Sequence, residues 1–219
     1  MTTKVQGDMY DIDGATVATV AAADKINFFD VTDSLVKEDT VQGILDLGGG
    51  AWNLIGTQAA STSASLTQTG LSSTYAYYVI HISDLVTSGN SKLISCRFGD
   101  SSGIDSGASD YEWWVGGGRS YGSGHQDDLD TSDSEIHLGT EGQGNVSGEA
   151  SHFTINLNLG GSSSWPSMTW IGYTYDSYIV PVHGAGVRKA IITTDRFQIF
   201  PPDGTLDEGR MTTWGVSHA

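Results

Sequence analysis

Five carboxylates stand close together in the middle of the chain, within a Gly/Ser/Asp-rich stretch that we expect to be a long loop, residues 116–148. Oxygen-rich loops bind Ca²⁺ when several carboxylates converge, and a dense acidic run repels itself unless a cation or a basic partner neutralises it. The spacing lacks the EF-hand order and its central glycine, so a solvated loop without an ion is the alternative. The candidate calcium ligands are Asp127, Asp128, Asp130 and Asp133, with Glu135 following them. No other cofactor is expected.

Aromatic side chains gather in and around the expected loops, where they could contact a glycan or a protein. Sugar rings bind by laying their C–H faces on aromatic planes, and aromatic side chains are also favoured in protein interfaces. Trp113 and Trp114 are consecutive, so within a strand they must point to opposite faces, one in the core and the other exposed or at an interface. Burial in the core is the alternative for most of the others. The candidate contacts for a receptor or glycan are Trp114, Tyr121, His125, Trp165 and Tyr178.

The chain carries none of the common catalytic patterns. It has no Gly-x-Ser-x-Gly elbow, P-loop or Rossmann fingerprint, and its six histidines show no zinc-binding spacing. His125 and His183 fall in expected loops and could meet in space. Cys96, the single cysteine, cannot form an intrachain disulfide and lies in an apolar strand pattern, which predicts a small buried side chain. We therefore expect a protein that is not an enzyme.

The charge balance restricts the partners. Only 10 Lys and Arg residues oppose 26 Asp and Glu residues, for a formal net charge of −16. Binding to nucleic acid needs clustered Lys and Arg, so nucleic acid is not an expected partner. No apolar stretch is long enough to span a bilayer, and no signal peptide is recognisable, so we expect no membrane insertion.

The elements that must position these residues are strands. Low charge with abundant Gly, Ser and Thr favours β-structure with many turns, and His152 to Leu159 alternates apolar and polar residues over its whole length. Residues 51–219 are therefore predicted to form one all-β head domain, an antiparallel β-sandwich of jelly-roll or lectin-like type. The predicted strands are residues 52–55, 61–69, 75–82, 92–98, 111–115, 152–159, 168–175, 189–193, 197–200 and 210–216.

Residues 1–50 read as a separate arm joined to the head by Gly48, Gly49 and Gly50. We expect a strand over residues 25–31 and a short helix over residues 37–45. The arm is too small to bury its own apolar side chains, so we expect self-association around a symmetry axis; packing on its own head is the alternative. The residues expected to drive this association and attachment are Ile26, Phe28, Phe29, Val31, Val41 and Leu45.

The arm also carries a recognisable motif, Asp24-Lys25-Ile26-Asn27-Phe28-Phe29-Asp30-Val31-Thr32-Asp33. It resembles the Asp-Lys-Ile-x-Phe-x-Asp-x-(Thr/Ser)-Asp attachment module of fibre and spike proteins of tailed bacteriophages. The C-terminal segments from Phe197 to Phe200 and from Met211 to Val216 are similar to the closing strands of phage fibre heads, although Trp214 stands where tyrosine is commoner and Pro201-Pro202 replaces the usual Ser-Gly.

The resemblance implies a virion structural protein made in the host cytoplasm, either a short tail fibre or a receptor-binding spike. Its implied partners are further copies of itself in a homotrimer, other virion proteins, and a host-surface receptor or glycan. Two alternatives remain open at this point. One is a capsid decoration or head-fibre protein that grips shell subunits, and the other is a free lectin-like carbohydrate-binding module.

Overall fold

The computed structural model describes residues 25–30, 35–40, 51–118, 120 and 124–217. The chain divides into two compact units, Met1–Gly50 and Ala51–Ala219. In the first unit, β1 (Lys25–Asp30) pairs with β2 (Leu35–Thr40) as an antiparallel hairpin, from Lys25 opposite Thr40 to Asp30 opposite Leu35.

The arm differs from its prediction in one respect. The expected helix over residues 37–45 is wrong for its described part, because residues 37–40 belong to β2. A partner strand that pairs along the whole of β2 outweighs a weak helical pattern, since propensity yields to tertiary context. Of the residues expected to drive association, Ile26, Phe28 and Phe29 lie on β1. Val31, Val41 and Leu45 lie outside the described residues.

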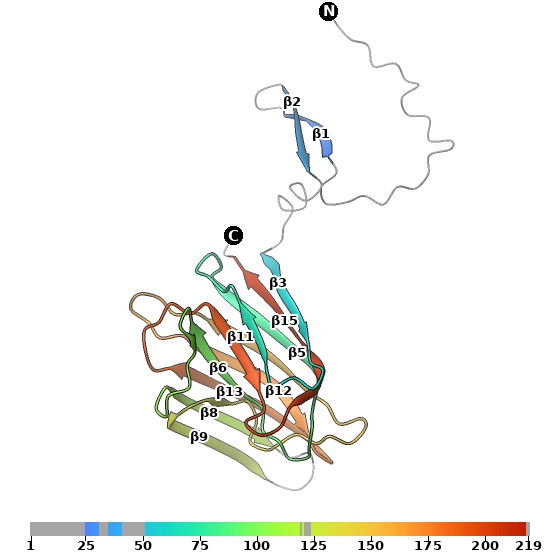
Figure 1. The fold of residues 1–219 in the computed structure, drawn as a ribbon, viewed down its shortest axis with the longest axis vertical. Coiled ribbons are helices and arrows are strands. Elements are labelled where there is room, and N and C mark those ends of the chain that lie inside the picture. The colour runs from blue at the N-terminus through green and yellow to red at the C-terminus, as the bar shows by residue number, and fades with distance from the viewer. Residues whose placement is uncertain (1–24, 31–34, 41–50, 119, 121–123, 218–219) are drawn as a thin grey trace, which may run out of the picture. The chain divides into compact units, whose positions relative to one another are not determined.

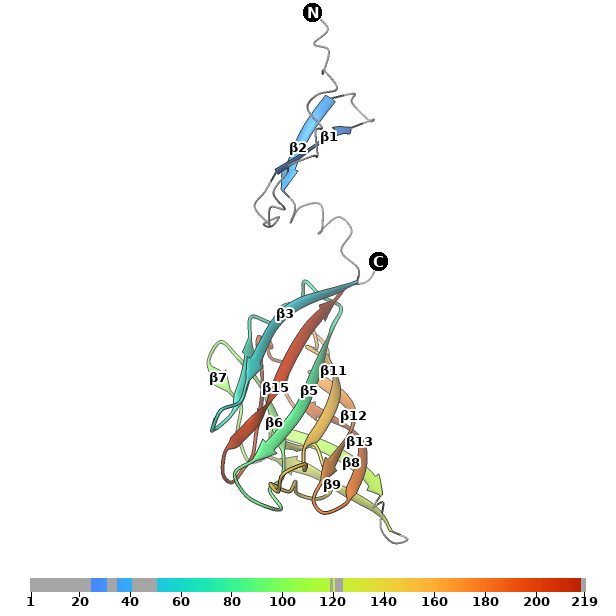
Figure 2. The same ribbon diagram turned by 90° about the vertical axis from the view of Figure 1, so that its right-hand side faces the viewer.

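The second unit is a sandwich of two antiparallel sheets (Figure 1 and Figure 2). The eight strands of the large sheet, in spatial order, are β3 (Trp52–Ala59), β15 (Leu206–Val216), β5 (Tyr77–Thr87), β11 (Ser151–Asn158), β12 (Ser167–Tyr175), β13 (Ile179–Arg188), β8 (Tyr111–Gly118) and β9 (His125–Asp133). The five strands of the small sheet are β10 (Ile136–His137), β6 (Ser95–Asp100), β14 (Arg196–Phe200), β4 (Leu66–Thr69) and β7 (Gly103–Ile104), the last paired with β6. Every pairing is antiparallel, and the described residues form no helix.

The core lies between the sheets and follows from the period-two pattern. On β11 the side chains of Phe153, Ile155 and Leu157 are buried, and the residues between them point the other way. Contacts between β6 of the small sheet and the large sheet close the core. The Tyr111 hydroxyl donates to the Phe98 carbonyl at 3.2 Å and accepts from the Phe98 N–H at 3.0 Å.

The predicted all-β antiparallel sandwich is confirmed, and the jelly-roll or lectin-like assignment stays a prediction. Cys96 is fully buried, 3.5 Å from the sulfur of Met168, as its strand pattern predicted. Burial raises the pKa of the Cys96 thiol well above its usual value.

Three segments depart from the strand predictions. The expected loop over residues 116–148 contains β9 and β10, because β9 adds to the edge of the large sheet beside β8. The expected strand over residues 189–193 does not form, and the Lys189 N–H instead donates to the Asp110 carbonyl at 2.7 Å. β13 was missed, because Pro181, Gly184 and Gly186 interrupt its apolar pattern.

Candidate ligand-binding face

The large sheet sets side by side strands that are far apart in the sequence (Figure 2), and its outward face is the one turned away from the core. The antiparallel register aligns them in rows across β5, β11, β12, β13 and β8. One row runs through His81, Thr154, Ile171, His183 and Gly116. The next row runs through Val79, Asn156, Thr169, Ala185 and Trp114. We call these two rows and the hollows around them the outward face.

Three shallow hollows lie along this face. Ile171 and Gly172 line both of the smaller two, which have volumes of about 350 and 240 Å³. The first of these also contains His125 and His183, and the second contains His81 and His152. A third hollow of about 490 Å³ lies nearer the Asn158 end of β11. Its outward-pointing lining residues are Tyr77, Asn156, Asn158, Ser167, Thr169, Ala185 and Val187.

The lining of the three hollows carries no fixed charge, although the chain as a whole is strongly acidic. None of the residues that line the three hollows is Asp, Glu, Lys or Arg. A separate hollow at the far end of β12 is different, because Asp84, Glu149 and Glu208 contribute to its lining. Two acids border the hollows on the same side of the sheet: Asp127 on β9 lies opposite Gly116, and Glu112 on β8 lies opposite Val187.

Trp114 forms an aromatic platform on this face. Its indole lies over Gly116, where an added Cβ would stand 2.6 Å from Cη2 of the ring. The His183 ring meets it edge-on, with 5.3 Å between the ring centroids. The Trp114 side chain is still 37% exposed. Because glycine at position 116 leaves room for the ring against the sheet, part of the indole surface is available to a ligand.

Beside Trp114, the face combines exposed apolar area with unused polar groups. Ile171 stands between two hollows and is 65% exposed. Asn156 lies opposite Thr169 in the register, and both side chains are exposed. Among the described residues, neither side chain has a hydrogen-bond partner. Their amide and hydroxyl groups are therefore free to pair with a ligand that itself carries donors and acceptors.

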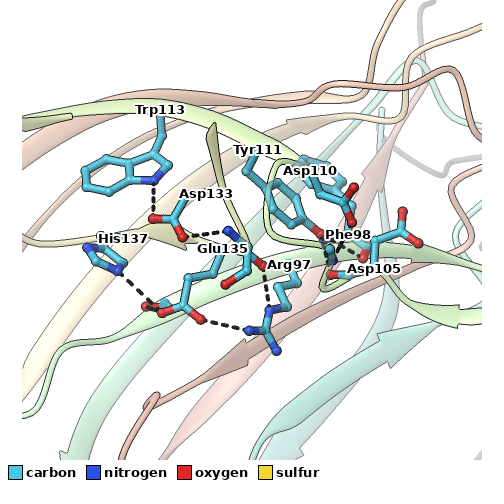
Figure 3. Close-up of polar contacts among 12 residues, drawn as sticks. Arg97, Phe98, Asp105, Asp110, Tyr111, Trp113, Asp133, Glu135 and His137 are labelled. Carbon is cyan, nitrogen blue, oxygen red and sulfur yellow. Dashed lines mark hydrogen bonds and ion pairs between the residues drawn. The ribbon is translucent and has the colours of Figure 1, made fainter. Parts of the chain in front are cut away.

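Behind the face, a half-buried polar network ties β8 and β9 to the small sheet (Figure 3). Glu135 accepts a hydrogen bond from Arg97 Nη2 at 2.9 Å and another from the Ser95 hydroxyl at 3.0 Å. His137 Nε2 lies 3.4 Å from the same carboxylate. Trp113, next to Trp114 but on the core side, donates its indole N–H to Asp133 at 3.2 Å. Because Trp113 and Trp114 are both on β8, these contacts hold in place the strand that carries the Trp114 ring.

The network shifts the pKa values of its two central groups in opposite directions. Burial alone would raise the pKa of Glu135, but hydrogen bonds from His137 and Ser95, together with the charges of Arg97 and His137, bring it below its usual value. Burial alone would lower the pKa of His137, but the hydrogen bond to Glu135 and the surrounding carboxylates raise it. Both shifts favour the charged pair.

The residues predicted to contact a receptor fall in different places. Trp114 and His125 both reach the outward face. Trp165 is 45% exposed but lies in the connection between β11 and β12, outside the strands. Tyr178 is half-buried, packs on the core and donates its hydroxyl to Glu141 at 2.8 Å. Tyr121 lies outside the described residues.

The four candidate calcium ligands lie along the edge strand β9 and do not converge. Asp127 is 2.8 Å from His125 Nε2, Asp130 accepts the Ser132 N–H at 2.7 Å, and Asp133 accepts the Trp113 indole. Asp128 pairs in register with Val115, so it points to the side opposite Asp127. Within the described residues, no group of three or more His, Cys, Asp or Glu side chains could hold a metal ion. The expectation of a convergent loop is wrong, because pairing with β8 spreads the acids along a strand.

His125 and His183 do share a hollow, but each lies on a strand and not in a loop. The sequence did not predict that four residues of the outward face lie side by side, namely Asn156, Thr169, Ile171 and His183. The strong alternation of β11 marked Asn156 as outward, yet only the register places the other three beside it.

No protein-family model, curated protein or solved structure matches this chain. The described residues contain no helix that is long and apolar enough to cross a membrane.

Proposed function

We propose that this chain is a virion structural protein of a tailed bacteriophage, a short tail fibre or receptor-binding spike that attaches the particle to the host surface. One observation carries the proposal. A small unit, whose strand β1 carries residues Lys25–Asp30 of the Asp24–Asp33 motif, precedes a separate β-sandwich whose large sheet presents hollows lined without Asp, Glu, Lys or Arg. The first unit mounts and oligomerises the protein, and the second contacts the receptor.

Self-association is part of this function. A unit of about 50 residues buries too little surface to be stable without support, and copies of the same arm around a symmetry axis supply it. We propose a homotrimer. Three heads on one particle bind multivalently, so weak binding at each head suffices for firm attachment. After its synthesis in the host cytoplasm, the protein is assembled into the virion and functions there.

A binding assay with the full chain tests this function. Fluorescently labelled protein is incubated with a panel of bacterial strains, and we expect it to decorate a subset of them and to reduce adsorption of the cognate phage to the same strains. Labelling of no strain by the protein contradicts the attachment role. If antibodies locate it on the capsid shell and its removal weakens the shell, the protein is instead a capsid decoration protein.

A second assay tests the arm. Sedimentation velocity should show a trimer of the full chain, and the double substitution Ile26→Asp and Phe28→Asp should convert it to a folded monomer. The double substitution Ile191→Asp and Val146→Asp, at two exposed apolar positions of the head, is the matched control and should leave the trimer intact. A monomeric full chain at micromolar concentration would remove self-association from the proposal.

A further inference from the structure

The outward face has the chemistry of a carbohydrate site in three respects. It presents the aromatic ring of Trp114 lying on the sheet. The exposed aliphatic side chain of Ile171 lies in the neighbouring row, two strands away. Amide and hydroxyl groups without partners complete the face. Sugars carry apolar C–H faces and many hydroxyls, so they need both kinds of contact within one shallow site. A groove for an apolar peptide or lipid would be lined more evenly by apolar side chains.

We propose that the outward face binds a neutral oligosaccharide, with Trp114 as the stacking platform and Asn156 and Thr169 as the groups that pair with sugar hydroxyls. This inference rests on the proposed attachment function and names the class of receptor. Hollows on either side of Ile171 give room for more than one sugar unit along the sheet.

The geometry around Trp114 favours stacking on its ring. The indole is held by Gly116 beneath it and by His183 at its edge, so it loses little freedom when a ligand covers it. Ala185 lies beside it in the register and is exposed, so no bulky side chain rises from the adjacent position of β13. Beyond Ala185, the row continues with Thr169 and Asn156, the two polar groups that lack partners. An oligosaccharide with one sugar stacked on the indole can therefore extend along this row and reach Thr169 and Asn156.

The charges select neutral sugars over acidic ones. The three hollows contain no Lys or Arg to pair with a carboxylate or sulfate, and a chain with a formal net charge of −16 repels anionic ligands at a distance. Acidic saccharides therefore lack both a partner at the site and a favourable long-range field. The histidines of the face can donate hydrogen bonds to hydroxyls in their neutral form.

Binding of the intact protein to an array of neutral and acidic oligosaccharides tests this inference, followed by calorimetric titration of the best ligand. We expect binding to neutral members only. Trp114→Ala and Asn156→Ala should each weaken the affinity about tenfold or more, the usual cost of truncating a central contact. Asn145→Ala, an exposed asparagine in the loop before β11, is the matched control and should bind as the original chain does. Circular dichroism of every variant shows that the fold is retained.

The remaining outcomes separate this inference from the attachment function. If the protein labels bacteria but binds no neutral oligosaccharide, the ligand class is wrong and the attachment function stands. If it binds a neutral oligosaccharide through Trp114 but neither labels cells nor competes with the phage, the ligand class stands and the attachment function fails. If Trp165→Ala abolishes binding while Trp114→Ala does not, the site is the β11–β12 connection and this inference is overturned. If Trp114→Ala changes only the oligomeric state, the face is a subunit interface, which also overturns it.

Discussion

Trp113 and Trp114 are neighbours on β8, yet their indoles lie on opposite sides of the large sheet, the first 4% exposed and the second 37% exposed. Trp113 bonds to Asp133 and lies 4.6 Å from the His137 ring, centroid to centroid, whereas Trp114 covers Gly116 on the outward face. One dipeptide thus joins the polar network to the candidate ligand-binding face. Alanine substitutions at these two positions should therefore differ in how much stability they remove.

Trp113→Ala should destabilise the head by about 3–5 kcal/mol, because it removes a large buried ring and leaves Asp133 without the indole donor. Trp114→Ala should cost less than about 1 kcal/mol, since its ring is partly solvated. Urea unfolding followed by circular dichroism measures both values. Equal losses of stability in the two variants would contradict the assignment of one ring to the core and the other to the outward face.

Arg97→Ala should cost about 3–5 kcal/mol, because it leaves the Glu135 carboxylate, whose side chain is only 10% exposed, without its arginine partner. The double substitution Arg97→Met and Glu135→Leu should recover much of this loss of stability, since it removes both charges together. Lys92→Ala is the control, because its partner Asp203 is 82% exposed and such pairs contribute about 0–1 kcal/mol. A loss in Arg97→Ala no larger than in Lys92→Ala would show that the network does not hold the sheets together.

The alternation of apolar and polar residues predicted both the fold class and the core face of β11, because a half-buried strand imposes that pattern directly. β13 escaped prediction for a physical reason. Gly184 sits under the Trp170 ring, where an added Cβ would lie 2.3 Å from the indole, and Gly186 faces Ile136. These glycines make space for large neighbours that only the folded sheet brings close, so their role cannot be read from the local sequence.

The candidate site, like β13, could be predicted from the sequence only in part. Trp114 was predictable, because two consecutive tryptophans in a strand must diverge. Ile171 and His183 belong to strands whose register with β8 is set by long-range pairing, and a shift of one residue would place each of them in the core. The sequence of β9 predicts a loop because aspartate is rare in central strands, although an edge strand tolerates several of them.

The His137–Glu135 pair predicts an optimum of stability at mildly acidic pH. The pKa of His137 is raised above its usual 6.5, so its contribution is complete below that value and is lost as the pH rises through the raised pKa. The pKa of Glu135 is lowered from 4.5, so its contribution is present above that value and is lost as the pH falls through the lowered pKa. The free energy of unfolding, measured by urea titration, should therefore decline on either side of the interval from 4.5 to 6.5.

His137→Gln isolates the histidine from other titrating groups. This variant should lose the decline of stability above pH 6.5 that His137 causes, and it should keep the decline at low pH. His81→Gln, at an exposed histidine on the outward face, is the matched control for the removal of an imidazole. Identical profiles of His137→Gln and the original chain would contradict the role of the ion pair.

The acids of β9 have a structural consequence that does not depend on an ion. β9 is an edge strand of the large sheet, so its outer backbone groups are open to pairing with another chain, and charged side chains prevent such pairing by mutual repulsion. Asp127→Asn, Asp128→Asn and Asp130→Asn together should increase association at high concentration, measured by light scattering at neutral pH. The same loss of charge at Asp84, Asp203 and Glu208, which lie off this edge, should have little effect. If both triple variants associate equally, overall charge and not the edge strand governs solubility.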